Sequence, residues 1–194
     1  MAQVSGWRRV GVGTILGLAW VSAAEICGLF TGLPFGEYRY TELWLPLIPL
    51  PQGHQFPVAL PITWFVLGGA VALLTGRRRF GWVWGGSLLA LIDFALEPVL
   101  TGPVGFWHWS SGDPPVLNYV GWFGVGAVLY TLLRPSMTVS DQMRRDMAVL
   151  LSIVLAGTLV IGVTHGEMLG LFALIPLAAV VVAFRRPLDS SAGQ

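Results

Sequence analysis

Residues Leu91–Trp122, LIDFALEPVLTGPVGFWHWSSGDPPVLNYVGW, decide the fold of this 194-residue chain. The stretch places two carboxyl side chains, Asp93 and Glu97, one helical turn apart in an otherwise apolar run. Ionisable side chains inside hydrophobic spans are rare and usually functional. We therefore expect the rest of the chain to be a membrane scaffold that holds these groups, together with a partner carboxyl group at Glu25, near one face of a bilayer.

The composition is that of an integral membrane protein. Hydrophobic residues make up 55% of the chain and charged residues only 11%, whereas an ordinary soluble domain carries roughly 25% charged residues. A net charge of +1 and the lack of a long basic tract argue against nucleic acid as a partner. The single cysteine, Cys27, excludes an intrachain disulfide.

Six mostly apolar stretches are each close to the roughly 20 residues that an α-helix needs to cross a hydrocarbon core. We therefore predict an all-α integral membrane protein, a single polytopic domain over residues 1–194 with about six transmembrane helices. The predicted spans are residues 10–30, 57–75, 80–100, 116–133, 147–163 and 168–184.

The arginines predict how these helices are oriented. Ten of the eleven basic residues, all arginines, fall in segments on one side of the predicted spans, and only Arg39 lies on the other. Because basic loops stay in the cytoplasm, we expect both termini there, with the protein in the cell membrane. Residues 31–56 then form an outer interfacial or re-entrant segment over the helix ends, since their apolar part is short and interrupted by prolines.

The N-terminus allows a second interpretation. Arg8 and Arg9, an apolar run and the small residues near 21–23 resemble a signal peptide with its cleavage site. The apolar run continues through Phe30, however, which is long enough to span a membrane. We therefore favour a first helix that is retained.

The predicted orientation brings four polar side chains to the outer ends of the helices. Asp93 and Glu97 share a helix face because they stand at positions i and i+4. Pro98 has no backbone N–H, so we expect the third helix to end or kink beside Glu97. The predicted polar cluster consists of Glu25, Asp93, Glu97 and Asn118.

Carboxyl groups beside aromatic rings suit proton addition to an alkene. Ionised carboxylates are costly in a low dielectric and repel one another, so we expect at least one of the three to be protonated at neutral pH. Aromatic faces can stabilise a developing cation by about 2 kcal/mol each when desolvated. The histidines show no metal-ligand spacing, so no metal is expected; they are His54, His108 and His165.

Short motifs follow one another from Glu25 to about Arg134. They are Glu25-x-x-Gly28, Gly32-Leu33-Pro34-Phe35-Gly36-x-Tyr38-x-Tyr40, Pro61-x-x-Trp64, Asp93-x-x-x-Glu97-Pro98, Trp107-x-Trp109 and Pro115-x-x-Asn118-x-x-Gly121-Trp122. As an ordered set they resemble the membrane-bound carotenoid biosynthesis family that includes carotenoid 1,2-hydratases. The resemblance implies cofactor-free addition of water across the terminal 1,2 double bond of an acyclic carotenoid end group, which yields a tertiary alcohol.

The resulting hypothesis gives each polar residue a role. Asp93 is the favoured acid that protonates the less substituted alkene carbon. Glu97 or Glu25 orients and deprotonates the attacking water, and Asn118 holds that water or a carboxyl group. The expected ligands are a lipid-soluble polyene or terpenoid and the bilayer, and association with other carotenoid pathway enzymes is left open. The expected substrate-binding residues are Tyr38, Tyr40, Trp64, Trp107, Trp109 and Trp122.

The sequence leaves three alternatives. A carotenoid or terpenoid cyclase or isomerase shares the cation chemistry and differs in what captures the cation. A proton-coupled transporter also holds carboxyl groups within its spans, but the chain has no convincing internal repeat and its polar groups lie toward one leaflet. A non-catalytic membrane assembly protein would tolerate Asp93→Asn and Glu97→Gln.

Overall fold

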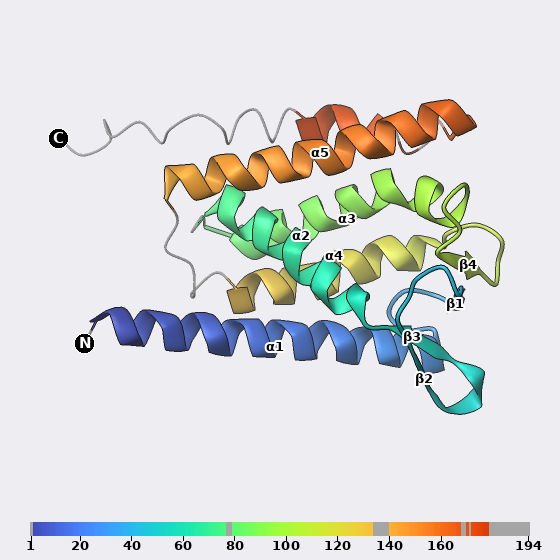
Figure 1. Ribbon diagram of the computed structural model, residues 1–194, viewed down its shortest axis with the longest axis horizontal. Coiled ribbons are helices and arrows are strands. Elements are labelled where there is room, and N and C mark those ends of the chain that lie inside the picture. Colours follow the sequence, from blue (N-terminus) through green and yellow to red (C-terminus); the bar gives the residue numbers. More distant parts are fainter. Residues whose placement is uncertain (1, 77–78, 134–139, 168–169, 171, 179–194) are drawn as a thin grey trace.

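The computed structural model describes residues 2–76, 79–133, 140–167, 170 and 172–178. Within these ranges the chain forms a bundle of helices that run alternately in opposite directions, with short strands gathered at one end (Figure 1). Residues 172–178 are also helical. The helices are α1 (Ala2–Thr31), α2 (Ala59–Thr75), α3 (Gly81–Thr101), α4 (Val116–Leu133) and α5 (Asp141–His165).

The helices have the length and composition of membrane spans. Four are long and apolar enough to cross a bilayer: residues Val10–Thr31 of α1, together with α3, α4 and α5. Helix α2 is also apolar but has 17 residues, which is about 26 Å at 1.5 Å per residue. The helical membrane class is thereby confirmed. The six-span count and the cytoplasmic termini stay predictions, and the predicted span 168–184 falls mostly outside the described residues.

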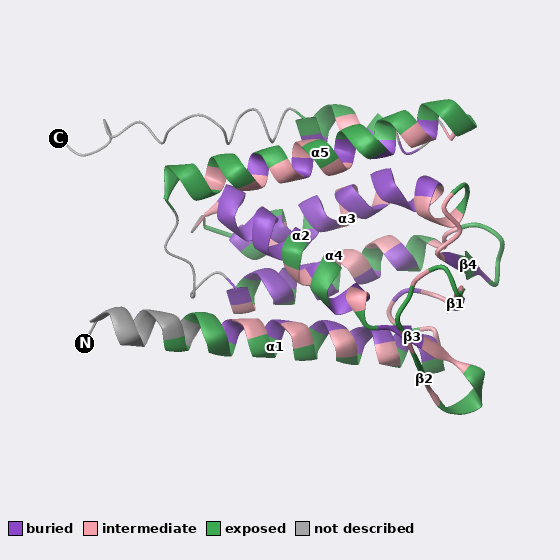
Figure 2. Ribbon diagram, viewed as in Figure 1, coloured by how far each residue is buried: buried purple, intermediate pink, exposed green. Residues whose placement is uncertain are grey.

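Helix α3 lies at the centre of the bundle. Half of its apolar window (50%) is buried, against 28% for α1 and for α5, and Figure 2 shows buried residues concentrated along α2 and α3. Glycines allow α4 to approach α3 closely. A Cβ atom on Gly86 would lie 2.5 Å from the backbone oxygen of Phe123. Small residues commonly allow such contacts between membrane helices, where lipid removes the hydrophobic driving force.

Two antiparallel ribbons cover one end of the bundle (Figure 1). Their side chains alternate between the two faces of each strand, so the aromatic residues of the first ribbon point inward while Arg39 and His108 are exposed. The ribbons are β1 (Tyr38–Tyr40) with β4 (Trp107–Trp109), and β2 (Leu47–Pro49) with β3 (Gln55–Pro57), with a 3₁₀ turn at Pro51–Gly53 between the last two.

The structure corrects the sequence prediction in two respects, one at the ribbons and one in helix α3. The all-α expectation omits the four strands, and the segment after α1 pairs with the connection between α3 and α4 through β1 and β4. Helix α3 also continues through Pro98 to Thr101. Of the two expectations for this proline, a helix end is therefore wrong, and a kink stays a prediction. The backbone amide of Gly102 donates to the carbonyl oxygen of Pro98 at 3.1 Å.

Replacing Gly86 by alanine is expected to destabilise the protein, because the new methyl group would press on the Phe123 carbonyl and push α3 away from α4. Overpacking of this kind costs about 1–3 kcal/mol. The matched control is Gly124→Ala on α4, where a Cβ atom meets nothing within 4 Å. The measurement is the midpoint of thermal unfolding in detergent. Equal midpoints for the two variants would contradict this helix contact.

Candidate active site

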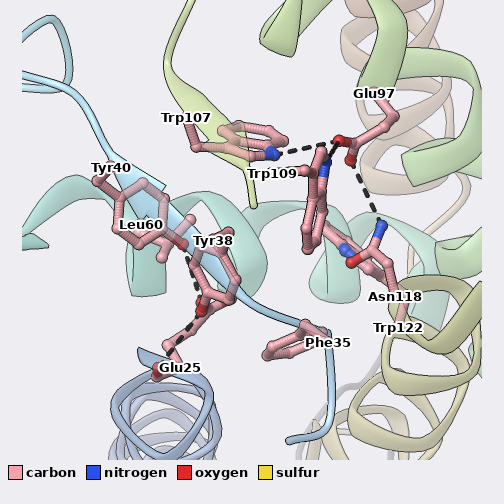
Figure 3. A pocket seen from close by; sticks show the side chains of 10 residues that line it. All are labelled: Glu25, Phe35, Tyr38, Tyr40, Leu60, Glu97, Trp107, Trp109, Asn118 and Trp122. Atoms are coloured by element: carbon pink, nitrogen blue, oxygen red, sulfur yellow. Dashed lines mark hydrogen bonds between the residues drawn. The ribbon is translucent and has the colours of Figure 1, made fainter. Parts of the chain in front are cut away.

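Glu25 lies near the C-terminal end of α1 and is only 4% exposed. Its Oε2 atom accepts hydrogen bonds from the hydroxyl groups of Tyr38, at 2.7 Å, and Tyr40, at 2.9 Å (Figure 3). Its Oε1 atom accepts a third bond from the Trp64 indole N–H at 2.8 Å. Because burying an unpartnered charge costs several kcal/mol, these neutral donors are what allow a carboxyl group at this depth.

A second carboxyl cluster lies on α3. Asp93 and Glu97 are both buried, and the side-chain amide of Asn118 donates to Asp93 Oδ2 at 2.7 Å and to Glu97 Oε2 at 3.4 Å. Glu97 Oε1 accepts from the indole N–H groups of Trp107, at 3.1 Å, and Trp109. The structure thus brings the two acids of α3 to one amide on α4.

The ribbon of β1 and β4 supplies donors to both clusters. Its register places Tyr38 opposite Trp109 and Tyr40 opposite Trp107. All four side chains lie on the inward face, where the tyrosines reach Glu25 and the tryptophans reach Glu97. Side chains alternate with a period of two, so a slip of one residue in either strand would turn its donors away.

A cavity of about 30 Å³ lies between the two clusters. Glu25 and Glu97 line it from opposite sides, with Asn118 beside Glu97 (Figure 3). Asp93 is not among the described residues that line it. A cavity of this size holds a water molecule and is too small for a branched hydrocarbon end group. The remaining lining residues are Phe35, Tyr38, Tyr40, Leu60, Trp107, Trp109 and Trp122.

Trp64 lies outside this lining, unlike the other expected substrate-binding residues. Its ring stacks on Trp122, with centroids 3.7 Å apart, while its N–H group holds Glu25. The sequence analysis missed Phe35 and Leu60 as lining residues, although Phe35 stands within a quoted motif. The sequence pattern also favours an interfacial anchor at Trp44, whereas its ring packs 5.7 Å from that of Trp107.

The two tyrosines of β1 stay protonated over a wide pH range. Burial, with the neighbouring Glu25 carboxyl group as the next cause, raises the pKa of Tyr38 and of Tyr40 well above the ordinary value for a phenol. Both hydroxyl groups therefore remain hydrogen-bond donors to Glu25 throughout the physiological range.

A larger, polar pocket of about 410 Å³ shares Trp109 with the lining of the cavity. Its lining includes His108, Asp113, Tyr119 and Glu167. In the part of the chain that the structure describes, no three histidine, cysteine or acidic side chains are grouped so that they could hold a metal ion.

The fold and the site together define a multi-pass helical membrane protein in which buried carboxyl groups face an aromatic cavity. The model of the carotenoid biosynthesis protein family matches residues 1–184, and the chain belongs to that family. The resemblance noted in the sequence is thereby confirmed.

The chain is also similar to the bisanhydrobacterioruberin hydratase of Haloarcula japonica. The two are 32% identical over 136 residues, which cover 64% of this chain and 45% of the relative. The chain therefore spans about half the length of this curated relative. No solved structure matches the chain.

Tyr40→Phe is expected to change how stability depends on pH. The pKa of Tyr40 is higher in the folded than in the unfolded protein, so its contribution is fully present below about pH 10 and is lost as the pH rises further. The wild-type free energy of unfolding should therefore fall above about pH 10, and the variant should show a shallower fall. The measurement is denaturant unfolding in detergent between neutral and alkaline pH.

Trp64→Phe is the matched control for this experiment, because it also removes a donor to Glu25 but adds or removes no titratable group. Each variant should lose about 1–3 kcal/mol at neutral pH, the cost of leaving a buried acceptor without its donor. Trp64→Phe should lose more, because it also shrinks a buried ring that stacks on Trp122. Only Tyr40→Phe should alter the alkaline slope. If the free energy of unfolding fell equally steeply with pH in the wild type and both variants, the raised pKa of Tyr40 would be contradicted.

Proposed function

We propose that this protein is a carotenoid biosynthesis enzyme that adds water, without a cofactor, to the terminal 1,2 double bond of an acyclic carotenoid end group. The observation that carries the proposal is the pair of carboxyl groups, Glu25 and Glu97, on opposite sides of one aromatic cavity. Membership of the carotenoid biosynthesis family and similarity to a hydratase support it.

The acid in this mechanism is the pair formed by Asp93 and Glu97. Neighbouring carboxyl groups titrate as a unit and can share one proton, and Asn118 holds the two together. Glu97 accepts two indole N–H bonds that favour its ionised form, whereas among the described residues Asp93 accepts from Asn118 alone. We therefore assign storage of the proton to Asp93 and its delivery to Glu97, which faces the cavity.

Proton transfer forms a C–H bond at the less substituted alkene carbon and leaves a tertiary cation at its neighbour. The ring faces of the cavity lining, among them Trp107, Trp109 and Trp122, stabilise this cation. A water molecule then forms a C–O bond to the cation and gives a proton to Glu25, whose three donors favour its ionised form between turnovers. Glu25 returns that proton to solvent and the acid pair takes one up, so the net change is the addition of one water.

Hydration requires a supply of water to a buried site, and we assign this supply to the pocket that shares Trp109 with the cavity. It lies next to the cavity and carries ionisable side chains, including Asp113 and Glu167. A cyclase would instead need to keep water from the cation until an internal alkene captured it. This pocket therefore favours hydration over cyclisation.

The arginines support an orientation for the protein. Arg8, Arg79, Arg144 and Arg145 belong to the helix ends opposite the ribbons, and Arg144 donates to the backbone oxygen of Leu74 at 3.0 Å. By the positive-inside rule this end faces the cytoplasm. We therefore propose a multi-pass protein of the cell membrane with six spans, cytoplasmic termini and the active site near the outer leaflet.

Expression in cells that accumulate an acyclic carotenoid is expected to produce a pigment heavier by one water. Chromatography with mass spectrometry should detect it with the wild type, whereas Asp93→Asn and Glu97→Gln should lower its yield by roughly 10²-fold or more, the usual contribution of general acid catalysis. Glu25→Gln should have a similar effect because it removes the base.

Glu37→Gln is the matched control, since Glu37 is an exposed carboxyl group next to Tyr38 in the chain, and its yield should equal that of the wild type. A product that is an isomer of unchanged mass would show that the reaction is a cyclisation or an isomerisation and not a hydration. Unchanged pigments with a well-expressed wild type would contradict the proposed reaction, and full activity of the carboxyl variants would contradict the assigned site.

A further inference from the structure

An apolar groove of about 480 Å³ lies between α2, α3 and α5. Its lining on α5 extends from Leu150 to Ile161, which is about 16 Å at 1.5 Å per residue. Ile62 on α2 and Ile153 on α5 line it and are 56% and 63% exposed. In a bilayer the groove therefore opens sideways, toward lipid.

The groove is almost entirely apolar along the part of the chain that the structure describes. Besides the indole of Trp44, its polar side chains are Thr63 and Thr158. Both hydroxyl groups donate to backbone oxygens one turn earlier in their own helices, at 3.1 and 2.9 Å. Its described lining contains no charged residue. A surface of this kind suits a hydrocarbon chain and has nothing to bind the polar headgroup of a phospholipid.

The groove also reaches the wall of the candidate active site. Leu96 and Leu100 line it on either side of Glu97 in the chain. At the ribbon end it is lined by Trp44 and Phe106, whose ring centroids lie 4.4 Å apart. Trp44 in turn packs 5.7 Å from Trp107, which lines the cavity and donates to Glu97.

We propose that this groove binds the hydrocarbon chain of the polyene substrate, so that the reacting end group passes Trp44 and reaches the cavity between Glu25 and Glu97. The inference rests on the proposed function and adds where the substrate enters and lies. The groove, of about 480 Å³, holds the long, unreactive part of the molecule, and the cavity of about 30 Å³ must widen to admit the end group. Movement of the Trp44 side chain joins the two spaces when the substrate enters.

Gly157 provides the test. It lines the groove, and a Cβ atom there meets nothing within 4 Å, so the position has room for a side chain that takes up groove space. The series Gly157→Ala, Gly157→Leu and Gly157→Phe is assayed as purified protein in detergent with two substrates. One is a full-length acyclic carotenoid, and the other is a short terpene alkene with the same end group. The matched control is Gly124→Phe on α4, which is also open but lies outside the groove.

Conversion of the long substrate is expected to fall progressively along the series, through a higher KM, by on the order of tenfold or more for the largest side chain. Conversion of the short alkene should stay at the wild-type level, and Gly124→Phe should match the wild type with both. Equal losses of activity with both substrates, or no loss with either, would overturn the proposal that the groove binds the hydrocarbon chain. Failure of the wild type to hydrate either substrate would instead overturn the proposed function. If Gly157→Phe does not fold, Gly157→Leu decides the outcome.

Discussion

Buried carboxyl oxygens require hydrogen-bond donors inside the protein, and this requirement links nearly every part of the structure. Helix α1 contributes Glu25 and α3 contributes Glu97, yet no helix alone could satisfy them. The donors come from the ribbon of β1 and β4 and from α2 and α4. The irregular segments between the helices are thus structural partners of the acids, and the buried side-chain nitrogen and oxygen atoms in the described residues all have a partner.

The chemical nature of these donors matters as much as their number. An arginine paired with Glu25 or Glu97 would fix the carboxyl group as an anion. Phenol, indole and amide groups carry no charge, so they stabilise an anion while leaving proton uptake and release accessible. The same rings that carry the N–H and O–H groups also present their faces to the cavity. In the proposed mechanism, one set of side chains therefore serves both the acids and a developing cation.

The surroundings of the site divide into two environments. The polar pocket that shares Trp109 with the cavity suits water, and the groove along α5 suits hydrocarbon. The aromatic layer that contains Trp107 and Trp109 stands between them. The proposed hydration of a lipid-soluble alkene needs both environments within reach of one acid, and a helical bundle with a ribbon over its end has both.

The sequence by itself determined the membrane class, because long apolar runs have few other stable structures. It also singled out Asp93, Glu97, Glu25 and Asn118, since acids in apolar spans are conspicuous, and predicted them as one cluster. The structure instead holds Glu25 apart from the other three, with its own donors. Only the tertiary structure decided which acid faces the cavity, because that depends on small rotations of packed helices. It alone also paired β1 with β4, since strands of three residues, far apart in the chain, carry too little local signal. The role of their alternating aromatic residues as hydrogen-bond donors is visible only when the buried carboxyl groups are placed on the inward face of the ribbon.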